Sequence, residues 1–245
     1  MRFDVIAFDA DDTLWHTEYL YRDARDKLAA LLADYIDAGT LADRLDRTEI
    51  ANLGLYGYGV KSFALSMIET VVELTDGQVG GHEIRGTIDI AREMLSAKVR
   101  LLDHVEETLS ALTPEYELMV ITKGDASEQV PKLHRTGLID DFRYVEVVGT
   151  KTVDTYRHLL EKYGLAPERF LMVGNSLKSD ILPVLALGGY GVYIASEILW
   201  THEHVEETPN HERYFELDDI GEVPALVREL SAVSNQPSAG DRSRK

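Results

Sequence analysis

The segment that most constrains the fold lies at the start of the chain, where a short apolar run ends in acidic residues. Asp4 to Phe8 is apolar and β-branched and predicts a buried strand, and Asp9, Asp11 and Asp12 follow it directly. Carboxylates crowded at the end of a buried strand repel one another and lose hydration, so folding alone does not favour them there. A divalent cation with oxygen ligands would offset that repulsion. The alternative is an acidic turn that caps a helix at Asp11 or Asp12.

The part of the chain after Val99 alternates short apolar strands with amphipathic helices. This alternation predicts a parallel sheet covered by helices on both faces, that is, an α/β fold with a doubly wound parallel sheet built from residues 1–16 and 99–232. The predicted strands are Glu117–Ile121, Tyr144–Val148, Phe170–Val173, Gly191–Ala195 and Tyr214–Leu217, and the predicted helices are His104–Leu112, Ala126–Thr136, Val153–Tyr163, Ile181–Leu187 and Val223–Leu230.

Residues 17–98 have a different pattern, with helical periodicity and no convincing strand. Apolar residues recur at helical spacing from Leu20 to Tyr35 and from Val60 to Val72, and more weakly from His82 to Ala97. We therefore predict an inserted all-helical domain at 17–98. The polar stretch 233–245 predicts a flexible C-terminal tail.

Composition excludes several classes of function. The net charge of −18 argues against nucleic-acid binding, which needs a basic surface. The chain has no cysteine, which excludes disulfides, thiolate catalysis and zinc–thiolate sites. No apolar run approaches the roughly 18–20 residues of a membrane span, and Asp4 and Asp9 interrupt any secretory signal. We expect a cytoplasmic protein without membrane or nucleic-acid partners, as a monomer or a homodimer.

Polar side chains follow four separate predicted strands at the point where each ends. Ligands of open parallel sheets bind beyond the carboxyl ends of the strands, so these groups are expected to meet in one site. Taken singly, a threonine there could cap the next helix and a lysine could be an ordinary exposed residue. Their joint placement favours a site, formed by Asp9 and Asp11, Thr122, Lys151, and Asn175 with Asp180.

At these residues the chain resembles the haloacid dehalogenase-like hydrolases. The resemblance covers nearly the whole chain, and residues 17–98 lie where that family inserts a helical cap, which implies a Rossmann-like core with a cap domain. The matching segments are Asp9-Ala10-Asp11-Asp12-Thr13-Leu14, Thr122-Lys123-Gly124-Asp125, Lys151, and Gly174-Asn175-Ser176 through Asp180.

The resemblance also implies a role for each of these residues. Asp9 would attack phosphorus and form an aspartyl-phosphate, and Asp11 would act as general acid and base. Thr122 and Lys151 would bind the phosphate, together with the backbone amides of Lys123 and Gly124. The implied cofactor is Mg²⁺, with ligands from Asp9, the carbonyl of Asp11, Asn175 and Asp180.

Three departures from the family pattern affect these expectations. Asn175 stands where an aspartate is common, which removes a negative charge from the metal site. Lys151 is followed by Thr152 in place of a frequent proline. Lys123 replaces a frequent asparagine and is either a solvated lysine or a cation near the substrate.

The intact pair of Asp9 and Asp11 favours hydrolysis of phosphate esters, because the family's dehalogenases lack the second aspartate. We therefore predict a Mg²⁺-dependent phosphatase that acts on a small phosphorylated metabolite. A sugar phosphomutase and a catalytically weak protein that binds phosphorylated ligands remain alternatives.

One further segment bears on specificity. Leu53–Lys61 is glycine-rich and aromatic and predicts a tight turn between two helices, with Tyr56, Tyr58 and Lys61 as candidate specificity residues; the alternative is a plain helix connection with exposed aromatics. Trp15 is expected to pack the joint between the helical domain and the core; the alternative is that it lines the pocket. The histidines of the acidic loop, His202, His204 and His211, have no spacing typical of a metal site.

Overall fold

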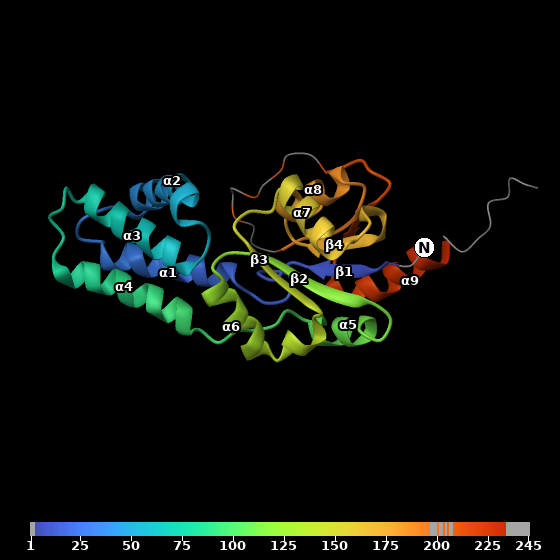
Figure 1. The fold of residues 1–245 in the computed structure, drawn as a ribbon. Helices are drawn as coiled ribbons and strands as arrows, with labels where there is room; N and C mark the ends of the chain where they lie inside the picture. Colours follow the sequence, from blue (N-terminus) through green and yellow to red (C-terminus); the bar gives the residue numbers. More distant parts are fainter. Residues whose placement is uncertain (1–2, 197–199, 201–202, 204, 206–207, 234–245) are drawn as a thin grey trace, which may run out of the picture.

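A computed structural model describes residues 3–196, 200, 203, 205 and 208–233. Its centre is one six-stranded parallel sheet in the order β3-β2-β1-β4-β5-β6 (Figure 1). The α/β class and the doubly wound parallel sheet are thus confirmed. The strands are β1 (Val5–Phe8), β2 (Glu117–Lys123), β3 (Tyr144–Val148), β4 (Phe170–Gly174), β5 (Tyr190–Ile194) and β6 (Tyr214–Leu217).

The central strand β1 is buried on both faces. Its successive side chains point to opposite sides of the sheet, and each side is covered by helices. Ile6 and Phe8 belong to one apolar cluster, Val5 and Ala7 to another, and all four are fully buried. The first cluster includes residues of helices α5 (Val105–Leu112), α6 (Ala126–Thr136) and α9 (Val223–Val233), and the second includes residues of α7 (Val153–Tyr163) and α8 (Leu182–Ala186). Figure 1 shows these two sets on opposite faces of the sheet.

Four helices between β1 and β2 have a hydrophobic core of their own, and we call them the helical unit (Figure 1). Its buried residues include Leu28, Leu45, Phe63 and Met67. The four helices are α1 (Glu18–Leu31), α2 (Ala38–Tyr56), α3 (Val60–Leu74) and α4 (Gly81–Ser96). None of the helices among the described residues is both long and apolar enough to cross a membrane.

Helix α2 is the main element that sequence reasoning missed. The turn expected within Leu53–Lys61 does connect two helices, but it is shorter than expected, because α2 extends to Tyr56 and only residues 57–59 separate it from α3. The helix buries Thr48, Glu49 and Asn52 beside its leucines, so its buried face lacks the apolar spacing that identifies a helix.

Smaller differences occur near the carboxyl ends of the strands. The helix expected over Ile181–Leu187 is preceded by a π-helical turn at Leu177–Ile181, so the helical segment begins four residues earlier. The predicted tail is described only to Val233, where α9 ends, and the rest of it lies outside the described residues, as do His202 and His204. Short 3₁₀ turns occupy Leu138–Asp141, Pro167–Arg169 and Ile220–Glu222.

Candidate active site

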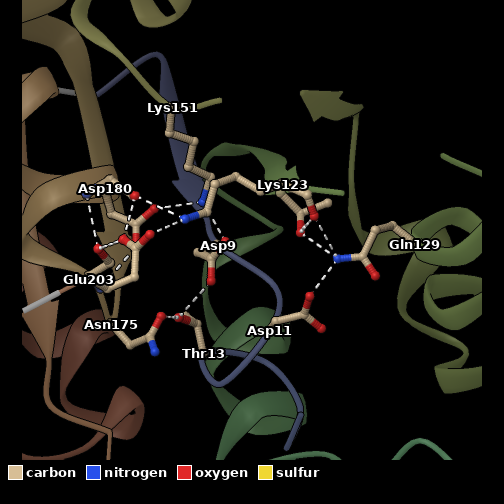
Figure 2. Close-up of polar contacts among 12 residues, drawn as sticks. Asp9, Asp11, Thr13, Lys123, Gln129, Lys151, Asn175, Asp180 and Glu203 are labelled. Atoms are coloured by element: carbon tan, nitrogen blue, oxygen red, sulfur yellow. Dashed lines mark hydrogen bonds and ion pairs between the residues drawn. The ribbon is translucent and has the colours of Figure 1, made fainter. Parts of the chain in front are cut away.

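A buried ammonium group lies between two buried carboxylates at the carboxyl end of β1. Lys151, from the loop after β3, contacts Asp9 and donates to Asp180 Oδ1 at 2.6 Å (Figure 2). The Lys151 and Asp180 side chains are each 1% exposed. Burial raises the pKa of Asp9 to about 7, an effect that Lys151 opposes. Burial by itself lowers the pKa of Lys151, but Asp180 and Asp9 raise it above its ordinary value, so the lysine is charged.

Asp180 is held by both of its carboxylate oxygens. Oδ1 accepts from Lys151, and Oδ2 accepts from the backbone N–H of Ser176 at 3.0 Å. This arrangement requires Gly174, because a Cβ there would collide with the carboxyl carbon of Asp180. Asp180 therefore fixes both the position of Lys151 and the loop that carries Asn175.

Two oxygen atoms from different strands converge on one hydroxyl group. Thr13 Oγ1 lies 3.4 Å from Asp9 Oδ2 and 3.3 Å from Asn175 Oδ1, as Figure 2 shows. A carboxylate and an amide oxygen that face the same point suit a hard cation. Within the described part of the chain, no three His, Cys, Asp or Glu side chains form a metal cluster. A cation here would therefore depend on the Asn175 amide as well as on carboxylates.

Asp11 lies on the same loop and accepts hydrogen bonds from four side chains. Oδ1 accepts from Trp15 Nε1 at 2.7 Å, Thr17 Oγ1 at 2.6 Å and Lys132 Nζ at 3.0 Å. Oδ2 accepts from Gln129 Nε2 at 2.6 Å. Burial alone would raise the pKa of Asp11, but Lys132 and the other donors lower it below its ordinary value. Asp9 thus lies beside Lys151, whereas Asp11 lies in a separate, strongly donating environment.

Asp12, the third acid of the segment, has a structural role. Its Oδ1 accepts from the backbone N–H of Thr17 at 2.8 Å, and its Oδ2 accepts from that of Glu18 at 3.0 Å, at the start of α1. The capping alternative considered for this segment therefore applies to Asp12, while Asp11 makes side-chain contacts only with donors around the site.

Gln129, on α6, joins the second carboxylate to the end of β2. Its Nε2 lies 2.6 Å from Asp11 Oδ2, as Figure 2 shows. The same Nε2 lies 2.8 Å from Thr122 Oγ1. Thr122 does not cap the next helix, because Asp125 does so by accepting from Ser127 N at 2.7 Å. The Thr122 hydroxyl accepts from Gln129 and donates to the backbone carbonyl of Lys123 at 3.3 Å, so it is held at the edge of the cavity.

Lys123 forms a partly buried ion pair with an acid from a distant part of the chain. Its Nζ lies 2.6 Å from Glu203 Oε1, and Glu203 Oε2 accepts from Ser176 and Ser179, each at 2.5 Å. Although Glu203 is buried, Lys123 and the two serines lower its pKa to about 2. The Lys123 ammonium also lies 4.5 Å from the centroid of the Tyr58 ring. Lys123 is therefore not a solvated lysine.

The backbone N–H of Gly124 was expected to bind the phosphate. Gly124 lines the same cavity with a φ of 128°, but its N–H already donates to Val148 O at 3.2 Å.

The structure brings one of the three specificity candidates of the helical unit to this cavity. Tyr58 lines it, together with Trp200. Tyr56 ends α2, is 49% exposed and does not line it. Lys61 is held by Asp125 at 2.6 Å and lines a neighbouring cavity.

Three of the residues around the site, Gln129, Lys132 and Glu203, escaped sequence reasoning. Trp15 is buried at the joint, as expected, but its indole N–H also binds Asp11. Gln129 and Lys132 lie three residues apart on α6 and so share a helix face, a signal that becomes informative only once α6 is placed beside β1. Glu203 comes from the loop whose histidines were considered, and nothing in its sequence context indicates the contact.

The fold and the site together define a class of protein, an α/β enzyme whose acidic, lysine-containing site lies at the carboxyl ends of the central parallel strands. A model of the haloacid dehalogenase-like hydrolases matches residues 3–188. The chain therefore belongs to the haloacid dehalogenase-like hydrolases.

Individual relatives agree with this assignment. A haloacid dehalogenase-like family hydrolase from Xanthomonas campestris is 38% identical, with a TM-score of 0.86 over 95% of this chain and 93% of that chain. A glyceraldehyde 3-phosphate phosphatase from Methanothermobacter thermautotrophicus is 27% identical over 91% of this chain and 98% of its own length. A phosphatase of the same name from Methanocaldococcus jannaschii is 26% identical over 75% of this chain and 81% of its own length.

Proposed function

We propose that the protein is a Mg²⁺-dependent phosphatase that hydrolyses a small phosphomonoester through an aspartyl-phosphate on Asp9. The observation that carries the proposal is the pair of carboxylates on one loop, with Asp9 against the buried Lys151 and Asp11 among four separate donors. The curated relatives named above, which are phosphatases, support the same reaction class.

In the proposed first step, an Asp9 carboxylate oxygen bonds to phosphorus while the bond from phosphorus to the leaving oxygen breaks. Asp11 donates its proton to that oxygen, so the product leaves as an alcohol. In the second step, a water molecule gives a proton to Asp11 and attacks phosphorus, which releases inorganic phosphate and frees Asp9. The donors around Asp11 stabilise its ionised form, which is the form that accepts the proton from water, and the proton taken up in this way is the one that Asp11 donates in the first step of the next turnover.

The residues of the site also fit a hard divalent cation. Asp9 and Asn175 present oxygen atoms to a common point, and two buried carboxylates, Asp9 and Asp180, face a single ammonium group, Lys151. We propose that Asp9, Asn175 and the backbone carbonyl of Asp11 hold Mg²⁺, with Asp180 beside them. Bound Mg²⁺ would neutralise charge on the transferred phosphoryl group.

The leaving group faces the helical unit, which we propose acts as a cap. The cavity has a volume of about 140 Å³ and is lined on that side by residues that include Tyr21, Leu53, Tyr58 and Phe63. Pockets for drug-sized ligands measure roughly 300–1,000 Å³, so this cavity suits a small metabolite.

Turnover of p-nitrophenyl phosphate tests the proposal. We expect activity with Mg²⁺, loss of activity in excess EDTA, and loss in Asp9→Asn and in Asp11→Asn. The exposed residue Asp43 provides a matched control, because Asp43→Asn makes the same chemical change outside the cavity. Full activity in Asp9→Asn would refute the nucleophile. Tight phosphate binding without turnover in the unmodified protein would favour the alternative of a binding protein.

A further inference from the structure

The cavity is strongly acidic, and each of its cations is already paired. Among the described residues that line it, nine are carboxylates and only four are basic. Lys151 contacts Asp9 and Asp180, and Lys132 lies 3.0 Å from Asp11. These two lysines belong to the reacting end of the cavity, where the phosphoryl group itself would compete for them.

The two remaining cations that line the cavity pair with carboxylates other than Asp9 and Asp11. Arg25, on α1, makes contacts of 2.7 Å with Asp46 and with Glu49. Lys123 makes its 2.6 Å contact with Glu203, whose second oxygen is fixed by two serine hydroxyls. A substrate anion could bind either cation only by displacing a buried or half-buried carboxylate.

From this charge arrangement, and on the basis of the phosphatase function proposed above, we propose that the protein selects phosphate esters whose leaving alcohol carries no second negative charge. Glu203 is the specificity-determining residue, because it neutralises Lys123 on the leaving-group side. A carboxylate or a second phosphate on the alcohol would find no free cation among the described lining residues and would meet an excess of carboxylates.

The substrate class that fits is a phosphorylated polyol, hydroxyaldehyde or sugar of small size. The same wall offers hydrogen-bonding groups to hydroxyls, from Ser62, Tyr58 and Glu49, and apolar contact from Leu53 and Phe63. A neutral polyol or sugar can use both kinds of contact, through its hydroxyl groups and its carbon chain, without disturbing the ion pairs.

The test uses two substrates of matched size that differ in one charge. Glyceraldehyde 3-phosphate has a neutral leaving group, and 3-phosphoglycerate has a carboxylate in place of the aldehyde. The measured quantity is the ratio of their kcat/KM values in the full-length protein with Mg²⁺. We expect the neutral substrate to be preferred by about tenfold or more, the size of one charge-assisted contact.

Glu203→Gln supplies the sharper test, because it frees the Lys123 ammonium while keeping an acceptor oxygen for the serines. The ratio should move by about tenfold toward 3-phosphoglycerate, and Lys123→Met in the Glu203→Gln background should abolish that shift. Glu229→Gln, an exposed change on α9, should leave the ratio at its original value.

The outcomes separate this inference from the proposed function. If neither substrate nor p-nitrophenyl phosphate is hydrolysed, the phosphatase proposal fails. If both substrates are hydrolysed with equal kcat/KM, the phosphatase function stands and the charge selectivity is overturned. The same conclusion follows if Glu203→Gln is folded and active but leaves the ratio of the two kcat/KM values unchanged. A Glu203→Gln variant that does not fold leaves the wild-type ratio and the Lys123→Met variant as the test. Removing Lys123 alone should not reduce the preference for the neutral substrate.

Discussion

Replacing Lys151 with methionine isolates the interaction that holds the site together. The ammonium lies between Asp9 and Asp180, and its side chain is 1% exposed. Methionine has a similar length and fills the same space, so little packing is lost. The change leaves two buried carboxylates facing each other without a cation.

The expected cost follows from this geometry. Removing one partner of a buried ion pair destabilises a protein by roughly 3–5 kcal/mol, because the remaining charge is left buried and unpaired. For a chain of this size, 1 kcal/mol corresponds to a change in Tm of about 2–4 °C, so Lys151→Met should lower Tm by roughly 6–20 °C in EDTA. Added Mg²⁺ should recover part of this loss if it binds beside Asp9, since a ligand that binds only the folded state stabilises it.

Thermal unfolding followed by circular dichroism measures both effects. Lys162→Met is the matched control, because Lys162 pairs with Glu146 at 2.5 Å but is 57% exposed. Exposed pairs contribute about 0–1 kcal/mol, so this control should lie within a few degrees of the unmodified protein. If Lys151→Met and Lys162→Met unfold at the same temperature in EDTA, the Lys151 ammonium does not stabilise the fold by neutralising Asp9 and Asp180.

Three further predictions concern residues around the site. The pKa of Glu203 is lowered to about 2 from an ordinary value of 4.5, so the stability that Glu203 contributes is present above about pH 4.5 and is lost as the pH falls toward 2. In urea titrations, the free energy of unfolding should therefore fall less between pH 6 and pH 3 for Glu203→Gln than for the unmodified protein. Gln129→Met removes donors to Asp11 and Thr122, and kcat/KM for p-nitrophenyl phosphate should fall by roughly 10–100-fold while the fold is retained; an unchanged value would exclude a positioning role. Asp12→Ala removes the acceptor for the first N–H groups of α1 and should lower the free energy of unfolding by about 0.5–2 kcal/mol in urea titrations, and no change would contradict the capping assignment.

The local parts of the fold were predictable because their signals are local. The run from Asp4 to Phe8 defines β1 by its composition, and Asp9 must follow at its end whatever the rest of the chain does. The same holds for β4, where an apolar run stops at Gly174 and Asn175. Once the strands are parallel, their carboxyl ends lie on one edge of the sheet, which is why residues far apart in sequence could be expected to meet.

The contacts between elements were not predictable in the same way. Lys123 was identified, but its partner Glu203 comes from a loop that follows β5, and no spacing rule connects the two. Helix α2 was missed because its buried Asn52 and Thr48 look like surface residues until the rest of the helical unit is present. Asn52 is satisfied there by Ser66 at 3.1 Å and Glu69 at 2.7 Å, both on α3.

The joint between the sheet and the helical unit bears directly on the chemistry. Trp15 and Thr17 both donate to Asp11, and Thr17 is the residue immediately before α1. On the other side of the joint, His16 N donates to Arg100 O at 2.9 Å, so two chain segments connect the helical unit to the core at this level. Any rotation of the helical unit about these segments must move Thr17 relative to Asp11, whereas Gln129 and Lys132 stay with the sheet. The proposed proton-transfer group is thus held half by the core and half by the first residues of the helical unit, which couples its position to the placement of the helices over the cavity.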